Sequence, residues 1–204
     1  MRNPFRVAII TGIPGVGKTT VLQLVEEKAR DEEMNIFIAN YGTYMIKTAT
    51  KEGIAKDRDE LRKLRLRDQL ELQKLAAENM IEDAAEKLES KSKGYLLIDT
   101  HSIIKTIVGY WPGLPKHVTD VFKPDLIVLI EANPKVIHQR QVKDITRKRS
   151  DFGGPEAIRE LRDFARYSAI ASAVFYGSAV AIVENPEGHP ETAASKIMEL
   201  LRNI

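Results

Sequence analysis

Three glycines and a lysine near the start of the chain have the spacing of a phosphate-binding loop. Residues 11–20 read TGIPGVGKTT, which matches the pattern G-x-x-x-x-G-K-[ST]. Glycine has no Cβ atom, so backbone N–H groups at such positions can turn inward around a phosphate. The helical pattern that follows adds unpaired N–H groups and the positive end of a helix dipole. The segment therefore predicts a nucleoside triphosphate site.

Individual positions of this loop have separate expected roles. Lys18 would reach the terminal phosphates, and the hydroxyl of Thr19 would ligate Mg²⁺. A chance match in a glycine-rich turn is the alternative, but an apolar strand pattern precedes the loop and a helical one follows it. The predicted ATP-binding residues are Gly12, Ile13, Pro14, Gly15, Val16, Gly17, Lys18, Thr19 and Thr20.

The carboxylate of Asp99 is a second candidate for chemistry. It ends the apolar run 95–99 and is followed by Thr100-His101-Ser102. A magnesium-binding carboxylate is expected at the carboxyl end of a strand in a parallel sheet, beside the phosphate loop. Many strands end in Asp, so Asp99 alone is weak evidence for a metal site. The phosphate loop in the same chain makes the evidence strong. Together, Thr19 and Asp99 predict a Mg²⁺ site.

A basic run at residues 140–151 has three interpretations. The run could be a solvated charged face. It could be a nucleic-acid patch, but no aromatic residues lie between its arginines. It could also be a lid that binds phosphoryl oxygens. Planar guanidinium groups match the charge that phosphoryl transfer spreads over those oxygens. Because a phosphate loop is present in the same chain, we favour the lid. We expect Arg140, Arg147 and Arg149, with Lys18, to be catalytic.

A second pair of arginines precedes the longest helical pattern. Arg58 and Arg62 are four residues apart, so they lie on one face of a helix. They could bind a second anionic substrate. Alternatively, they pair within the helix with Asp59 or Glu60, and the sequence leaves both interpretations open.

The composition bounds the class of protein. The chain has 204 residues, of which 43% are hydrophobic and 29% charged, and its net charge is +2. This fits one domain with a core of ordinary size. The small net charge argues against nucleic-acid or membrane binding. The chain has no cysteine, no signal-peptide pattern and no apolar run long enough to span a membrane. We expect a cytoplasmic protein.

Short apolar runs alternate with longer amphipathic ones. This alternation predicts a parallel sheet with helices on both faces, a three-layer α/β/α fold of the P-loop type. Residues 103–123, which contain several glycines and prolines, are expected to be irregular and to lie on the surface near the site. The expected strands are 5–11, 35–39, 95–99, 126–131 and 179–184. The expected helices are 18–33, 43–52, 58–64, 67–90, 134–143, 155–175 and 191–202.

The helix expected at 67–90 carries a broad apolar stripe. Packing on the sheet explains the stripe. A surplus of apolar surface could also serve a subunit interface.

Taken together, these motifs resemble the archaeal type of adenylate kinase, a branch of the nucleoside monophosphate kinases. The resemblance covers nearly the full length, in the right order. Its more specific pieces are Asp99-Thr100-His101-Ser102 and the GYWPGLP segment at residues 109–115. The chain keeps the usual Lys18, and it has Lys47 about where bacterial relatives place an arginine. The other motifs that carry the resemblance are residues 12–20, 40–43, 57–64 and 105–106, and the basic run to Asp151.

The resemblance implies reversible transfer of a phosphoryl group from Mg-ATP to AMP, which gives two ADP. It implies a single P-loop kinase domain over 1–204, with an AMP-binding flap at about 40–66 and a short lid at about 140–153. Known members of this branch are trimers, so we expect a homo-oligomer, and a trimer in particular. ATP adenine is expected near residues 184–188. The expected AMP-binding residues are Asn40, Gly42, Thr43, Arg58, Arg62 and His101.

Two alternatives remain at this stage. The chain could be a kinase of another nucleoside monophosphate or of a small metabolite, because sequence cannot position the loop that selects the base. It could also be a nucleotide-gated ATPase that binds RNA or drives assembly through its basic run. That alternative predicts salt-dependent RNA binding and no AMP-dependent formation of ADP.

Overall fold

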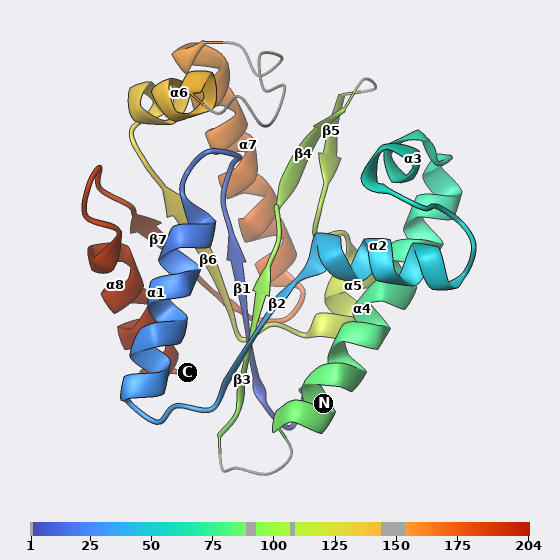
Figure 1. Ribbon diagram of the computed structural model, residues 1–204, viewed down its shortest axis with the longest axis horizontal. Helices are drawn as coiled ribbons and strands as arrows, with labels where there is room; N and C mark the ends of the chain where they lie inside the picture. The colour runs from blue at the N-terminus through green and yellow to red at the C-terminus, as the bar shows by residue number, and fades with distance from the viewer. Residues whose placement is uncertain (1, 89–92, 107–108, 144–153) are drawn as a thin grey trace.

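The computed structural model describes residues 2–88, 93–106, 109–143 and 154–204. A five-stranded parallel sheet with strand order β2-β3-β1-β6-β7 forms the centre of the molecule (Figure 1). This confirms the predicted P-loop α/β/α class. The strands are β1 (Arg6–Thr11), β2 (Ile36–Asn40), β3 (Tyr95–Asp99), β6 (Leu126–Glu131) and β7 (Ala179–Glu184).

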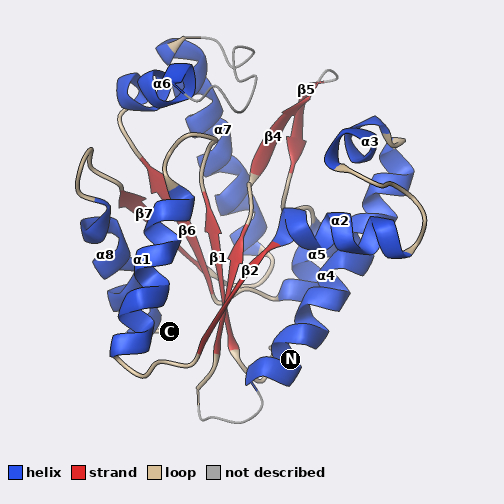
Figure 2. Cartoon of the chain, in the orientation of Figure 1, coloured by secondary structure: helices blue, strands red, loops and turns tan. Residues whose placement is uncertain are grey.

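Helices cover both faces of this sheet, as Figure 2 shows in blue against the red strands. One face carries α1 (Lys18–Asp31) and α8 (Pro190–Arg202), which pack against each other. The other carries α4 (Leu66–Leu88), α5 (Lys116–Phe122) and α7 (Pro155–Val174). The remaining helices, α2 (Tyr41–Lys51), α3 (Arg58–Lys63) and α6 (Pro134–Lys143), lie toward the carboxyl edge of the sheet.

The central strands are apolar because both of their faces are covered. In β1, β3 and β6 every residue except one at an end is buried. Parallel strands between two helical layers characteristically read as continuous apolar runs. The edge strand β7 differs, since only Val183 is buried in it. The core therefore lies between β1, β3 and β6 and the helices on either side.

The strand pairing decides which residues meet at the carboxyl edge. In β1 and β3, Ile10 pairs with Asp99, and in β2 and β3, Asn40 pairs with the same aspartate. Because β1 ends at Thr11, the phosphate loop leaves the sheet directly beside Asp99. The fold thus brings the loop and the two neighbouring strand ends to one place.

The expectation of irregular structure at residues 103–123 is wrong. Strands β4 (Ile103–Thr106) and β5 (Gly109–Pro112) form an antiparallel hairpin, and α5 follows it. The glycines and prolines mark the ends of short elements instead of breaking the whole segment. Gly113, for example, permits a close approach, since a Cβ there would lie 1.9 Å from the carbonyl oxygen of His101. The hairpin stands at the carboxyl edge of the sheet, between α7 and α2 (Figure 1).

Smaller differences concern where helices begin and end. Helix α2 begins at Tyr41, not at residue 43, because Asn40 caps it: the Asn40 side chain accepts a hydrogen bond from the Thr43 N–H. Helix α4 ends at Leu88, and the last two residues of its expected range lie outside the described part.

The apolar stripe of α4 is used for packing, and none of its members is exposed; they are Leu70, Leu72, Leu75, Ala76, Met80, Ile81, Ala84 and Leu88. This agrees with the simpler of the two interpretations of the stripe. A group of exposed apolar side chains lies on α7 and β7, and it includes Tyr167, Ile170, Val174 and Ile182. The helical periodicity identified an apolar face on α4 but could not show how much of it the sheet covers.

Candidate active site

The phosphate loop connects β1 to α1 and is shaped by its glycines. Gly15 and Gly17 have φ values of 90° and 95°, in the left-handed region that side chains disfavour. At Gly12, a Cβ atom would lie 2.6 Å from the carbonyl oxygen of Ile130. Helix α1 starts at Lys18 without a side-chain cap. Its first N–H groups are therefore available to an anionic ligand.

Lys18 lies where the loop meets the end of β3. Its Nζ atom is 3.4 Å from the carbonyl oxygen of Gly12 and 3.7 Å from Oδ1 of Asp99, and its side chain is only 10% exposed. His101 Nδ1 is 2.8 Å from the same Gly12 oxygen. The same Nδ1 atom is 3.5 Å from Nζ of Lys18. A hydrogen bond to the Gly12 oxygen requires the proton on Nδ1, because a carbonyl oxygen can only accept. The predicted Lys18, Asp99 and His101 are thus brought together, with His101 against the ATP loop.

Asn40 links the end of β2 to this group. Its Nδ2 atom donates to Oδ2 of Asp99 at 2.7 Å, while its Oδ1 accepts from the backbone N–H and the hydroxyl of Thr43. Asn40 therefore orients the Asp99 carboxylate and caps α2 at the same time. Gly42 and Thr43 lie in the first turn of that helix.

Thr19 and Asp99 fit the chemistry of a Mg²⁺ site. Mg²⁺ prefers hard oxygen ligands and typically takes one or two carboxylates together with substrate phosphates. Thr19 is exposed in the first turn of α1, and Asp99 ends the strand beside the loop. Among the described residues, no three His, Cys, Asp or Glu side chains cluster as a self-sufficient metal site. A Mg²⁺ ion here would need the nucleotide phosphates to complete its shell.

Three side chains hold the outer surface of the loop. Nη1 of Arg140 donates to the carbonyl oxygen of Val16 at 3.2 Å, and Nδ2 of Asn185 donates to the same oxygen at 2.8 Å. Nε2 of Gln141 donates to the carbonyl oxygen of Pro14 at 2.7 Å. Sequence reasoning identified Arg140, but it did not single out the two amides. Gln141 lies in the basic run at 140–151 and Asn185 in the segment 184–188, and no local pattern indicates that either contacts the loop.

An ion pair lies at the end of β6, also unidentified from the sequence. Arg166 of α7 makes a bidentate contact with Glu131, at 2.7 and 2.6 Å. The hydrogen bonds to Glu131 raise the pKa of Arg166 above its ordinary value. Arg162, one turn earlier, lines a pocket together with Gly12 and Glu131. The Arg166–Glu131 pair therefore fixes α7 to the end of β6, beside the phosphate loop.

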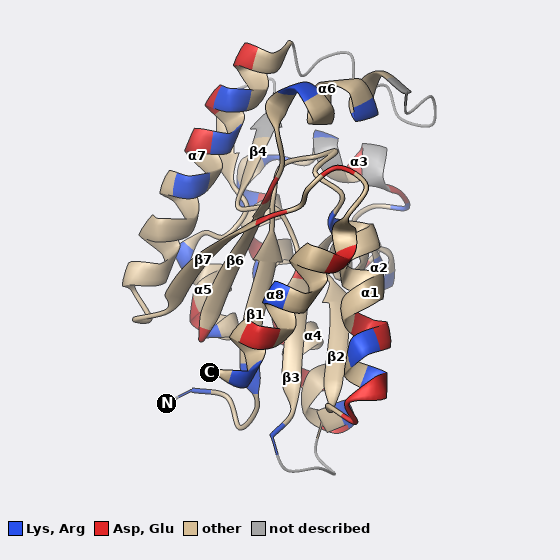
Figure 3. Cartoon of the chain, turned by 90° about the vertical axis from the view of Figure 1, so that its left-hand side faces the viewer, with Lys and Arg blue, Asp and Glu red and all other residues tan. Residues whose placement is uncertain are grey.

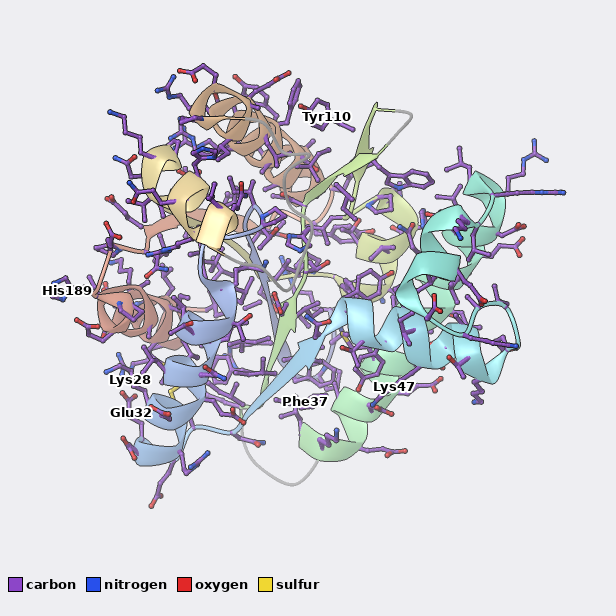
Figure 4. All side chains as sticks on the ribbon, turned by 45° about the horizontal axis from the view of Figure 1, so that its top comes forward. Lys28, Glu32, Phe37, Lys47, Tyr110 and His189 are labelled. Atoms are coloured by element: carbon purple, nitrogen blue, oxygen red, sulfur yellow. The ribbon has the colours of Figure 1, made fainter. Side chains whose placement is uncertain are left out.

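Other expected site residues fall partly or wholly outside the described part. Arg147 and Arg149 lie outside the described residues, as do the side chains of Arg58 and Arg62, although the backbone of α3 is described. Lys47 (labelled in Figure 4) has its Nζ atom 5.5 Å from the centre of the Tyr44 ring.

The sequence is similar to those of known proteins. A family model described as an AAA domain matches residues 11–159. The adenylate kinase of Saccharolobus solfataricus is 48% identical over 196 residues, which cover 96% of this chain and 99% of that protein. The adenylate kinases of Thermoplasma volcanium and Methanopyrus kandleri are 42% and 40% identical, again over nearly the full length of both chains.

Proposed function

The chain belongs to the archaeal adenylate kinases, and we propose that it transfers the γ-phosphoryl group of Mg-ATP reversibly to AMP, giving two ADP, in nucleotide homeostasis. One observation carries the proposal. The phosphate loop, Lys18 and the Asp99 carboxylate meet at the junction of β1 and β3, and Asn40 extends this group toward α2. An ATP site and an acceptor site on either side of that junction would face each other.

On the ATP side, the loop N–H groups bind the β- and γ-phosphates, and Lys18 offsets the charge that grows on the oxygen between them. Thr19 and Asp99 would hold Mg²⁺, which neutralises phosphate charge when bound. No protein group is covalently modified, because in-line placement and charge stabilisation suffice. The placement of Lys18 beside the Gly12 carbonyl supports this role.

On the acceptor side, AMP binds over the first turn of α2, with Thr43 near the base and Arg58 or Arg62 on the phosphate. The flap at about 40–66 comprises α2 and α3 and the segment that leads to α4. Asn40 supports this placement, because it ties the start of α2 to Asp99. His101 lies against the loop at Gly12, so it would face the region between the two nucleotides.

We assign residues 140–153 to a lid. Arg147 and Arg149 would close over the transferring phosphoryl group, and water would be excluded so that ATP is not hydrolysed. Arg140 stands at the root of this segment, on α6, and already contacts the loop through Val16. That contact supports the lid assignment.

The oligomer that we propose is a trimer that buries the exposed apolar face of α7 and β7. Figure 3 shows that the charged residues of α7 gather in its N-terminal half, whereas the C-terminal half and most of β7 are uncharged. Tyr167, Ile170 and Val174 are 66%, 52% and 74% exposed. Patches of this kind mark interaction sites. The cytoplasmic location stays a prediction; no described helix is long and apolar enough to cross a membrane.

The test is an assay of ADP formation by the pure protein with Mg-ATP, with and without AMP. We expect two ADP for each AMP consumed and none without AMP. GMP, CMP, UMP and dTMP in place of AMP distinguish the first alternative, since a preferred acceptor other than AMP would reassign the substrate. ATP consumption that does not depend on AMP, together with RNA binding that weakens steeply with salt, would favour the assembly ATPase instead.

A further inference from the structure

The outer face of the phosphate loop carries backbone carbonyl oxygens that need hydrogen-bond donors. A loop that turns its N–H groups toward phosphate turns carbonyl oxygens the other way, and buried carbonyls need donors. Val16 is buried, and both Val16 and Pro14 have their carbonyl oxygens against α6 and the end of β7, which flank the loop (Figure 1). The donors come from side chains distant in sequence.

Two of these donors are buried amides. Gln141, on α6, is 6% exposed and is the one donor to the Pro14 oxygen within the described residues. Asn185, directly after β7, is 3% exposed and donates to the Val16 oxygen. The backbone N–H of Asn185 also donates to the carbonyl oxygen of Glu131 at 2.7 Å, which fixes this residue to the sheet.

The glycines of the loop make room for these amides. A Cβ atom at Gly15 would lie 3.0 Å from Cγ of Gln141, and one at Gly17 would lie 2.6 Å from Nδ2 of Asn185. Both glycines also have positive φ values. The loop conformation and the close approach of the amides therefore depend on the same two positions.

One atom of the Asn185 side chain lowers the stability of the fold. Its Oδ1 atom is buried and has no hydrogen-bond partner in the part of the chain that the structure describes. Such an unpaired group costs stability, while the nitrogen of the same amide satisfies the Val16 oxygen. A buried polar atom left without a partner calls for an explanation, and the contact of the amide with the loop supplies one.

We propose that Gln141 and Asn185 are positioning residues of the phosphate loop. Their amides hold the carbonyl oxygens of Pro14 and Val16 outward, so that the loop N–H groups stay turned toward the phosphates before ATP binds. Preorganisation of this kind raises affinity because the ligand need not order the loop. The inference rests on the proposed function, since it takes the phosphates of ATP as the occupants of the loop.

The experiment compares the variants Gln141→Leu and Asn185→Leu with the wild type by isothermal titration with Mg-ATP and, separately, with inorganic tripolyphosphate. Tripolyphosphate has no base, so it reports on the loop alone. We expect both variants to lose affinity for the two ligands by the same factor, about fivefold or more. The KM for AMP should stay unchanged.

Gln73→Leu is the matched control. Gln73 is a similarly buried glutamine, 7% exposed, but its side chain contacts His117 between α4 and α5, away from the loop. It should leave both affinities unchanged. If Gln141→Leu does not fold, Gln141→Met, which keeps a long unbranched side chain, replaces it.

Three results would overturn the inference. Unchanged affinities with a lowered melting temperature would assign the amides a purely structural role. Weaker ATP binding with unchanged tripolyphosphate binding would place their effect on the nucleoside instead. A rise in the AMP KM equal to that of ATP would indicate general damage to the site. A wild type that forms no ADP would refute the proposed function, while the tripolyphosphate comparison would still test the loop.

Discussion

Lys18 is held in place by groups that compensate its charge before any nucleotide arrives. The Asp99 carboxylate and the Gly12 carbonyl lie within 4 Å of its Nζ atom. Because the Lys18 side chain is largely buried, a charged ammonium group without such neighbours would lower the stability of the fold. The arrangement keeps the charge at the place where phosphate oxygens are expected, so little reorganisation is needed when ATP binds.

We therefore expect Lys18→Ala to lower kcat about 100-fold or more, because charge stabilisation in the transition state is lost. The measurement is the rate of ADP formation at saturating ATP and AMP. Lys28→Ala, on the same helix but at its far end (Figure 4), is the control and should keep full activity. A Lys18→Ala variant within threefold of the wild type would refute the role.

The sequence predicted the residues on the side of the phosphate loop that would face the nucleotide. It did not predict Gln141 and Asn185, which contact the opposite side of the loop. The loop pattern and the strand that ends in Asp99 are local, so they can be identified without a structure. Gln141 and Asn185 contact residues more than a hundred positions away. Nothing in their own neighbourhoods indicates such partners, because the contacts depend on how α6 and β7 pack.

At the scale of elements, α5 is fixed to α4 through a neutral histidine. His117 contacts the Oε1 atom of Gln73 through Nε2, at 3.0 Å. Burial lowers the pKa of His117, and Lys74 adds to this effect while Asp120 opposes it. The fold therefore favours the neutral ring, which can donate from Nε2 to the glutamine.

This pKa shift predicts a pH dependence of stability. The unfolded chain takes up a proton on His117 more readily than the folded one, so the free energy of unfolding should fall as the pH decreases through and below the ordinary histidine pKa of about 6.5. His117→Gln keeps a donor but cannot titrate, and should remove this part of the decrease. Urea unfolding of both proteins between pH 5 and pH 8, at about one-unit steps, measures the difference.

His189→Gln is measured in parallel to control for the loss of one histidine, since His189 lies exposed before α8 (Figure 4). Parallel pH profiles for the wild type and His117→Gln would contradict the prediction.

The central sheet was predicted well, and the hairpin was not. Strands β3, β6 and β7 have the expected ranges, and β1 and β2 differ from theirs by one residue at one or both ends, because continuous apolar runs between helical patterns are a strong signal. The hairpin β4–β5 has strands of only four residues each, too short for a pattern to develop. Tyr110 on β5 (labelled in Figure 4) packs on Phe164 of α7, with ring centroids 4.6 Å apart. That contact depends on how the hairpin packs on α7, so the local sequence does not indicate it.

At the scale of the whole molecule, one edge of the sheet carries exposed apolar residues. Strand β7 forms this edge and pairs with β6 alone among the described strands. Val180 and Ile182 are exposed on it, next to the apolar end of α7. Exposed apolar edges favour association, and proteins that stay single usually protect them.

We expect the charge substitution Ile170→Asp, combined with Val174→Glu, to shift the protein from the trimer that we propose to a monomer. The reason is the cost of burying two new charges in an apolar contact. Light scattering after size-exclusion chromatography measures the mass. Leu66→Asp, at a residue that is 55% exposed at the start of α4, is the control. A wild type that is monomeric at working concentration would contradict the assignment of this face.

The position of β1 in the middle of the sheet also determines when the site can form during folding. Ile10 pairs with Asp99 and Thr11 with Leu129, so the first strand of the chain completes its pairing only with partners far along it. Closing such long loops is slow and delays folding. On the ribosome, a nascent chain that stops short of β6 would have one edge of β1 open and its phosphate loop unsupported. The N-terminal strand is thus synthesised first but completes its pairing only after β6 has been made, and until then its apolar residues are available to chaperones or to aggregation.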